Sequence, residues 1–241
     1  MEAPAVPGSV VGRMRAPGAW PAFQTLPGQV RMRHHRTRLG EAGMRVRVHS
    51  RAAVEDGAAE GADGVISVRP SAPSDRSDLD LACSQAVLGD ISAILPLRFD
   101  DIGVPAFGPY VGPGMEDVVS AIEFARSVRL RASDGTLAVH CEIGVSRSAA
   151  LALAAIADEL GPGREGEAVA RLLRDDADGR FQPNPRIVSL ADAALFRYGA
   201  IDAALAEACP RYVRWRQHWR EVFLDPEAHW RRIGKVKRKV K

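Results

Sequence analysis

The segment Val139–Ser148, with the sequence VHCEIGVSRS, constrains this 241-residue chain more than any other. The residues around its start, Thr136–His140, are short, β-branched and apolar, which is typical of a buried strand. The residues after it, Ala149–Ile156, are alanine, leucine and isoleucine, which strongly favour a helix. The pattern therefore predicts a strand, a tight loop and a helix N-terminus in direct succession.

This arrangement suits an anion. Backbone N–H groups of a tight loop that enters a helix converge on one spot and favour negative charge there. Arg147 adds a planar fork that binds two oxygens at once, and Gly144 permits a turn that a side chain would obstruct. The same local field favours the thiolate form of Cys141, which makes it a nucleophile beneath a phosphate cradle. The expected cradle comprises Glu142, Ile143, Gly144, Val145, Ser146 and Arg147.

The spacing between Cys141 and Arg147 is a weak signal by itself, because the chain is rich in arginine. The pattern becomes specific when His140, Gly144 and Ser148 are added and when a strand precedes it and a helix follows. The competing interpretation is a buried structural cysteine followed by a solvated arginine.

The segment from His140 to Ser148 resembles the signature loop of the cysteine-dependent protein tyrosine phosphatases. The resemblance is to the compact dual-specificity-like branch, in particular a bacterial group of small tyrosine phosphatases. It extends from about Met44 to Ala208 and includes Leu97–Ile102 and Pro183–Asp192. It implies a phosphocysteine intermediate and no cofactor.

The reaction also needs a carboxylic acid that protonates the leaving oxygen. Asp101 follows an expected strand about forty residues before Cys141, which is where the resembling phosphatases carry their acid. The adjacent Asp100 remains an alternative. The resemblance further implies that the hydroxyl of Ser148 helps the thiolate leave, although it also suits a helix cap. It implies that His140 tunes the thiol through loop hydrogen bonds and that Asn184 braces the loop.

The expected activity is hydrolysis of phosphotyrosine in proteins, with phosphoserine and phosphothreonine left open, or of small aryl phosphates. The loop adds no positive charge at Glu142, Ile143, Val145 or Ser146, and Glu142 would oppose a multiply phosphorylated headgroup. The alternative is a module that binds phosphorylated ligands or polyanions in the same cradle without turnover. The three cysteines lack the spacing of a disulfide framework, which indicates a reducing, cytoplasmic location. We expect no metal site, transmembrane segment or secretory signal, and the oligomeric state is open.

Charge divides the chain into three parts. Residues 1–43 carry a net charge of +4, residues 211–241 carry +8, and the total of +3 leaves −9 for residues 44–210. We expect 1–43 to be a disordered basic extension, 44–208 the phosphatase domain, and 209–241 a basic aromatic helix and tail. Weak contact of the basic ends with polyanions is a secondary expectation.

Alternating strands and helices predict an α/β domain with a mostly parallel central sheet flanked by helices, as in protein tyrosine phosphatases. Its site would lie at the carboxyl end of the strand before Cys141. Strands are expected at 44–49, 64–68, 91–99 and 136–140, and helices at 51–60, 115–130, 148–160, 165–176, 183–198 and 211–230. Residues 105–114 are expected to form a mobile loop near the site. Tyr212, Trp215, Trp219 and Val222 share one helical face that is expected to pack on the domain.

Overall fold

Four parallel strands form the central sheet in the order β1-β6-β2-β3. The structure is a computed structural model, and it describes residues 43–72, 93–229 and 231–232. The strands are β1 (Arg45–Ser50), β2 (Gly64–Arg69), β3 (Ile94–Arg98) and β6 (Thr136–Cys141). Because all four run in the same direction, their carboxyl ends lie at one edge of the sheet. The strand order places Cys141, at the end of β6, next to the ends of both β1 and β2.

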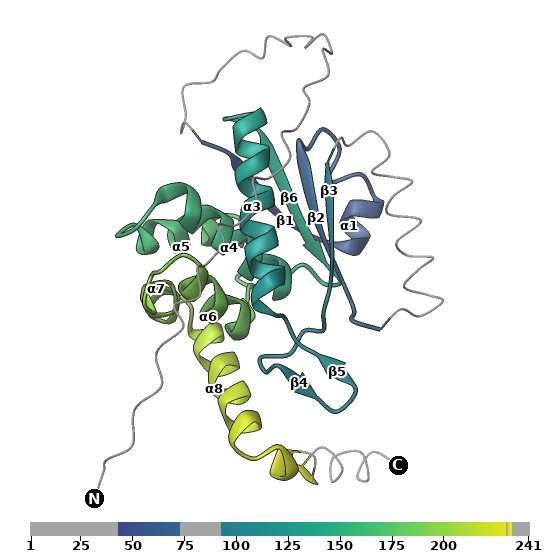
Figure 1. The fold of residues 1–241 in the computed structure, drawn as a ribbon, viewed down its shortest axis with the longest axis vertical. Coiled ribbons are helices and arrows are strands. Elements are labelled where there is room, and N and C mark those ends of the chain that lie inside the picture. Colours follow the sequence, from purple (N-terminus) through teal and green to yellow (C-terminus); the bar gives the residue numbers. More distant parts are fainter. Residues whose placement is uncertain (1–42, 73–92, 230, 233–241) are drawn as a thin grey trace, which may run out of the picture. The chain divides into compact units, whose positions relative to one another are not determined.

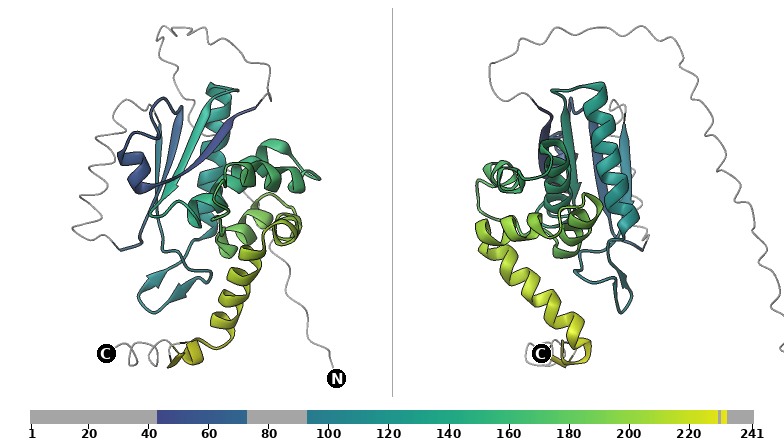
Figure 2. Two further views of the ribbon diagram at one scale, coloured as in Figure 1. Left: turned by 180° about the vertical axis from the view of Figure 1, so that it is seen from behind. Right: turned by 60° about the vertical axis from the view of Figure 1, so that its left-hand side comes forward.

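Helices cover both faces of this sheet (Figures 1 and 2). On one face, α4 (Arg147–Leu160) packs over β1 and β6, and α3 (Met115–Arg131) packs over β2 and β3. The short helix α1 (Arg51–Glu55) covers the other face, where Val54 joins Val65 and Ala138 in a separate small core. The main core lies between the sheet and α3 and α4. The α/β class and the mostly parallel sheet expected from the sequence are thus confirmed.

Four more helices extend the domain beyond α4. They are α5 (Glu165–Arg174), α6 (Pro185–Ala194), α7 (Ala200–Ala208) and α8 (Pro210–Leu224). Helices α5 and α6 pack on α4, and α8 packs on α6 and α7. Tyr212 and Val222 are fully buried and Trp219 nearly so, which confirms the predicted packing of this aromatic face. The described residues belong to one compact unit that includes α8, whereas the sequence-based boundaries at residues 43 and 208 stay predictions.

The structure corrects four of the expected elements. The helix predicted for 51–60 ends at Glu55, and turns follow it. The helix predicted to run to Tyr198 ends at Ala194, because Phe196 and Tyr198 adopt left-handed backbone conformations. The helix predicted for 211–230 is interrupted at Asp225. The expected loop 105–114 contains a two-stranded hairpin, β4 (Ala106–Phe107) and β5 (Tyr110–Val111). Helix α7 was not predicted.

Within the described ranges, no helix combines the length and hydropathy that a bilayer crossing requires. The tail 235–241, Cys83 and most of the polar loop expected at 71–80 lie outside the described residues.

Candidate functional site

Cys141 is the last residue of β6, and only 2% of its surface is exposed. Its Sγ lies 3.1 Å from the hydroxyl of Ser148, in the first turn of α4, and accepts a hydrogen bond from the Gly144 backbone N–H at 3.3 Å. The strand end therefore holds the sulfur at the base of the loop, between a backbone donor and a hydroxyl.

Only glycine fits at position 144 of this loop. Gly144 has a φ of +79°, and a Cβ there would lie 2.6 Å from the backbone nitrogen of Ser50 and 2.7 Å from the carbonyl carbon of His49. The loop thus presses directly on the end of β1. Among the described residues, the N–H groups of Ile143, Val145 and Ser146 have no protein acceptor. They are available to the oxygens of an anion.

Arg147 begins α4 and is 94% buried. Its Nη1 donates to the carbonyl oxygen of Phe99 at 2.9 Å, so the guanidinium bridges α4 and the end of β3. The buried Nε has no protein partner within the described part of the chain. A fixed guanidinium with unused donors suits bidentate binding of a tetrahedral anion.

Asp101 lies in the segment after β3 and reaches the signature loop. Its Oδ1 accepts hydrogen bonds from the Ser146 hydroxyl at 2.7 Å and from Asn184 Nδ2 at 2.9 Å. The buried Asn184 also donates to the Ile102 carbonyl at 3.1 Å, and its Oδ1 accepts the backbone N–H groups that open α6. The second oxygen of Asp101 accepts no hydrogen bond from a described residue, so it is available to a ligand.

The neighbouring Asp100 is used differently. Its carboxylate accepts hydrogen bonds from the hydroxyl and the backbone N–H of Ser71 and, at 2.9 Å, from the N–H of Val111. Both oxygens are thus engaged with Ser71, and Oδ2 also ties the chain that follows β2 to the β4–β5 hairpin. This difference favours Asp101 over Asp100 as the carboxyl group of the site.

His140 is completely buried on β6, on the strand face opposite Cys141, and is paired in register with His49. Burial, together with the positive charges of Arg69, His49 and Arg51, lowers the pKa of His140 to about 3, so the ring is neutral. Within the described residues neither ring nitrogen has a hydrogen-bond partner. The loop hydrogen bonds that the family resemblance implied for this residue are thus not formed by its ring here.

The carboxylate of Glu142 turns toward α1 instead of opposing an anion. It accepts hydrogen bonds from Arg51 Nε at 3.1 and 3.3 Å and from Arg51 Nη2 at 3.1 Å. The carboxylate of Glu55 lies 2.9 Å from Arg51 Nη1. Because Arg51 pairs with both carboxylates, it offsets the negative charge expected at the rim only in part.

Sequence reasoning missed the residues that hold the acid segment from behind. Ile102 and Val104 form a small buried cluster with Trp219 and Val222 of α8. Gly103 lies so close to Trp219 that a Cβ would fall 2.3 Å from the indole Cγ. The signal was the alternation of Ile102 and Val104 within an otherwise glycine- and proline-rich stretch.

No protein-family model and no curated protein matches this chain. Solved structures similar to it include PTPMT1 (15% identity, TM-score 0.39), which covers 68% of this chain and 95% of that one. The Yvh1 phosphatase domain from Chaetomium thermophilum has 17% identity and a TM-score of 0.40, with coverage of 68% and 96%. Tk-PTP in the active form has 14% identity and a TM-score of 0.39, with coverage of 65% and 94%. The bacterial branch named in the sequence resemblance stays a prediction.

Proposed function

We propose that this chain is a cysteine-dependent phosphatase that hydrolyses phosphotyrosine in proteins through a phosphocysteine intermediate. The observation that carries the proposal is the convergence of three groups on one loop. Cys141 lies at its base, Arg147 follows it, and Asp101 is hydrogen-bonded to its Ser146. This convergence requires two separate segments of the chain, the one after β3 and the loop between β6 and α4, to meet at the carboxyl edge of the sheet.

In the first step the sulfur of Cys141 attacks phosphorus, so that an S–P bond forms as the P–O bond to the leaving group breaks. Asp101, protonated, gives its proton to the departing oxygen. Arg147 and the loop N–H groups bind the non-bridging oxygens and stabilise their charge in the transition state.

In the second step water attacks phosphorus and the S–P bond breaks. Asp101, now ionised, accepts a proton from that water. The Ser148 hydroxyl, 3.1 Å from Sγ, donates to the departing thiolate. Inorganic phosphate is released, and Asp101 is protonated again for the next turnover.

The side chains of the loop support a phosphoprotein or aryl phosphate over a polyphosphorylated headgroup. Ile143 is uncharged and 63% exposed at the rim, and the carboxylate of Glu142 forms a salt bridge with Arg51. Neither side chain adds positive charge around the cradle. A single phosphate on an aromatic or aliphatic side chain matches one arginine and one set of backbone donors. Phosphoserine and phosphothreonine are proposed as further substrates of the same site.

The test is hydrolysis of a small aryl phosphate across pH, with reduced protein and a metal chelator present. The wild type should give a bell-shaped profile, and Cys141→Ser should be inactive while still binding vanadate. Wild-type protein that binds vanadate but turns nothing over would refute the enzyme and leave a phosphate-binding module. Loss of both binding and turnover in a folded wild type would refute the cradle itself.

A further inference from the structure

A groove with a volume of about 1020 Å³ opens beside the acid segment. One wall is Gly103–Pro105, which begins two residues after Asp101. Another starts at Pro185, directly after the Asn184 that binds Asp101. The rest is formed by α6, the 196–199 turn, the start of α7 and the last turns of α8. Two walls of the groove therefore start within two residues of Asp101 or directly after the asparagine that binds it, although Asp101 itself does not line the groove.

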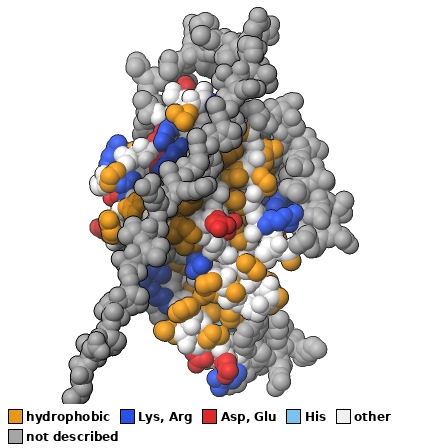
Figure 3. Space-filling view, in the orientation of Figure 1, with side chains coloured by type: hydrophobic (Ala, Val, Ile, Leu, Met, Phe, Trp, Pro, Cys, Tyr) orange, Lys and Arg blue, Asp and Glu red, His pale blue; other side chains and the backbone are white. Residues whose placement is uncertain are grey.

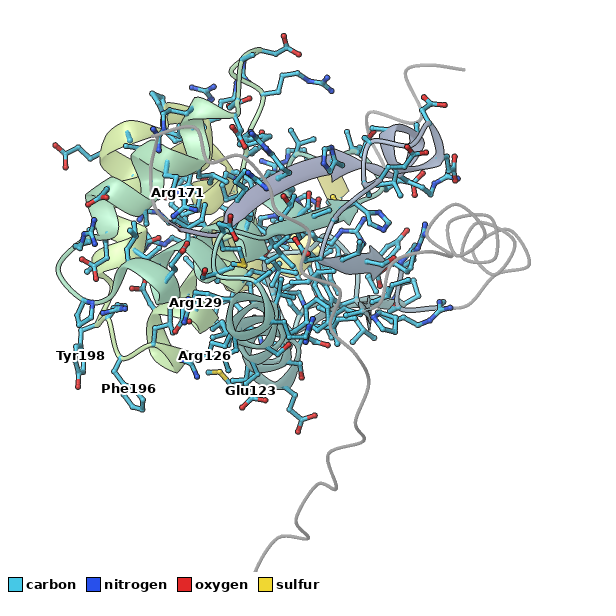
Figure 4. All side chains as sticks on the ribbon, turned by 90° about the horizontal axis from the view of Figure 1, so that it is seen from above. Glu123, Arg126, Arg129, Arg171, Phe196 and Tyr198 are labelled. Atoms are coloured by element: carbon cyan, nitrogen blue, oxygen red, sulfur yellow. The ribbon has the colours of Figure 1, made fainter. Side chains whose placement is uncertain are left out.

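The walls of this groove expose large apolar side chains. Phe196 is 76% exposed, Tyr198 93%, Phe223 66% and Leu224 81%. Figure 4 shows Phe196 and Tyr198 next to each other at the margin of the domain, both directed outward. Figure 3 shows hydrophobic side chains gathered over the part of the surface where α8 and β4–β5 lie in Figure 1. Exposed large apolar side chains that line one groove are typical of an interaction site.

The turn that carries the two aromatic residues is held in an unfavourable conformation. Phe196 and Tyr198 have φ angles of 54° and 53°, which bulky residues rarely adopt. Between them, the buried Arg197 donates to the Ala157 carbonyl at 3.1 Å and lies 3.6 Å from the carboxylate of Glu165. The anchor at Arg197 fixes the turn, and both flanking rings are displayed to solvent.

Charge at the groove indicates what it binds. Asp202 is paired with Arg216, and Asp192 accepts the N–H groups that begin α7. Arg186 and Arg220 also line the groove, and among the described residues neither has a carboxylate partner. The uncompensated charge is positive, which favours an acidic occupant. It disfavours the basic ends of this chain, Arg31–Arg38 and Lys235–Lys241.

We propose that this groove binds the segment of a phosphoprotein that flanks the phosphorylated residue, and that it selects segments with apolar and acidic side chains. The apolar side chains pack against Phe196, Phe223 and Leu224, and a carboxylate lies beside Arg220. The proposal rests on the proposed phosphatase function, because the occupant that it names is the substrate of that reaction. It adds a substrate class that the signature loop alone does not specify.

The experiment compares two phosphotyrosine peptides of equal length, one flanked on both sides by leucine and glutamate and the other by serine and lysine. A small aryl phosphate that does not extend into the groove normalises each kcat/KM. The wild type should prefer the leucine–glutamate peptide by at least tenfold. Arg220→Glu and Leu224→Ser should each lower the ratio of that peptide to the aryl phosphate by about tenfold.

Two matched controls separate the groove from general effects of charge and surface. Arg214→Glu makes the same charge change on an exposed position of α8 outside the groove. Leu130→Ser removes an 87% exposed leucine near the end of α3. Both should keep the wild-type ratio. An unchanged ratio in Arg220→Glu and Leu224→Ser overturns the proposal, as does an equal loss in the controls.

A second measurement keeps the groove testable if turnover fails. Binding of both peptides to Cys141→Ser protein is followed by fluorescence anisotropy, with and without Arg220→Glu. If the wild type hydrolyses neither the aryl phosphate nor the peptide, the proposed phosphatase function is refuted. Selective binding of the leucine–glutamate peptide, weakened by Arg220→Glu, would still support peptide binding in the groove. Light scattering that shows a dimer dissociated by Leu224→Ser would assign this face to a second copy of the chain and refute the proposal.

Discussion

The contact between Gly103 and Trp219 provides a direct test of how the acid segment is positioned. A Cβ at Gly103 would lie 2.3 Å from the indole Cγ and 2.6 Å from Trp219 Cβ and Cδ1. Real Cβ atoms essentially never approach within 3.0 Å of such atoms. In Gly103→Ala the segment and α8 must therefore separate by at least about 0.7 Å, the difference between these distances.

The segment, rather than α8, should give way. Helix α8 is anchored by the fully buried Tyr212, whose hydroxyl donates to Asp202, whereas the segment around Gly103 has no regular structure. Crowding of this kind costs about 1–3 kcal/mol of stability. A shift near 0.7 Å, two residues from Asp101, lengthens its hydrogen bonds of 2.7 and 2.9 Å toward the limit of such bonds.

Misplacement of a general acid by about 1 Å can cost on the order of 100-fold in rate. The loss should be largest for an aryl phosphate with a poor leaving group, because that oxygen depends most on proton donation. We therefore expect Gly103→Ala to lower kcat by about 10- to 100-fold on such a substrate and much less on one with a good leaving group.

The assay is steady-state turnover of both substrates together with chemical denaturation. The matched control is Gly166→Ala in α5, where a Cβ would meet nothing within 4 Å. It should leave turnover unchanged and stabilise the protein by about 0.5–1 kcal/mol. If Gly103→Ala is destabilised but turns over the poor substrate at the wild-type rate, packing on Trp219 does not position the acid and the reasoning is refuted.

Three further predictions concern the loop and its surroundings. Asp101→Asn should remove the basic limb of the pH–rate profile. Asp100→Asn should keep that limb and lower the free energy of unfolding by about 1–3 kcal/mol, because it weakens the hydrogen bonds to Ser71 and Val111. Rate profiles and denaturation of both variants check this, and exchanged phenotypes would reverse the assignment. Arg147→Lys should lower kcat/KM by 100-fold or more and weaken inhibition by vanadate, because a lysine cannot make two parallel bonds; a rate within tenfold of wild type would contradict this. The pKa of His140 is about 3 in the folded protein and 6.5 in the unfolded chain, so the unfolded state binds the proton more tightly. The stability that the neutral His140 contributes is therefore present above pH 6.5. It is lost as the pH falls toward 3, by on the order of 4 kcal/mol. His140→Leu should flatten the fall in unfolding free energy between pH 6 and 4, and a slope equal to wild type would show that this ring does not cause it.

The core of the site could be predicted because its determinants are local. The apolar run before Cys141, Gly144 and the alanine-rich run after Ser148 specify a strand, a tight turn and a helix within neighbouring residues. The structure forms these elements where they were expected. Asp101 could be named because it follows an expected strand about forty residues before Cys141, where the resembling phosphatases carry their acid.

What sequence could not predict depends on contacts between distant residues. The salt bridge of Glu142 with Arg51 joins positions 91 residues apart, so the charge of the loop could not be judged from its own residues. The early end of α6 follows from left-handed conformations at Phe196 and Tyr198, which no propensity favours and which the buried Arg197 between them holds in place. Helix α7 was missed because its short pattern begins directly after this turn.

The segment from Asp101 to Pro105 links the proposed acid to the groove. Asp101 is held by Ser146 and Asn184, whereas Gly103 and Val104 contact Trp219 and form a groove wall. An occupant that presses on this wall therefore acts on the same short stretch of backbone that positions the acid. A ligand can shift the balance between two conformations only if it binds one of them more tightly. An occupant whose apolar side chains bind best when residues 101–105 are packed on Trp219 would therefore stabilise Asp101 in the position that protonates the leaving oxygen. A flanking sequence that fills the groove should then raise kcat as well as lower KM, whereas a groove that only retained the substrate would change KM alone.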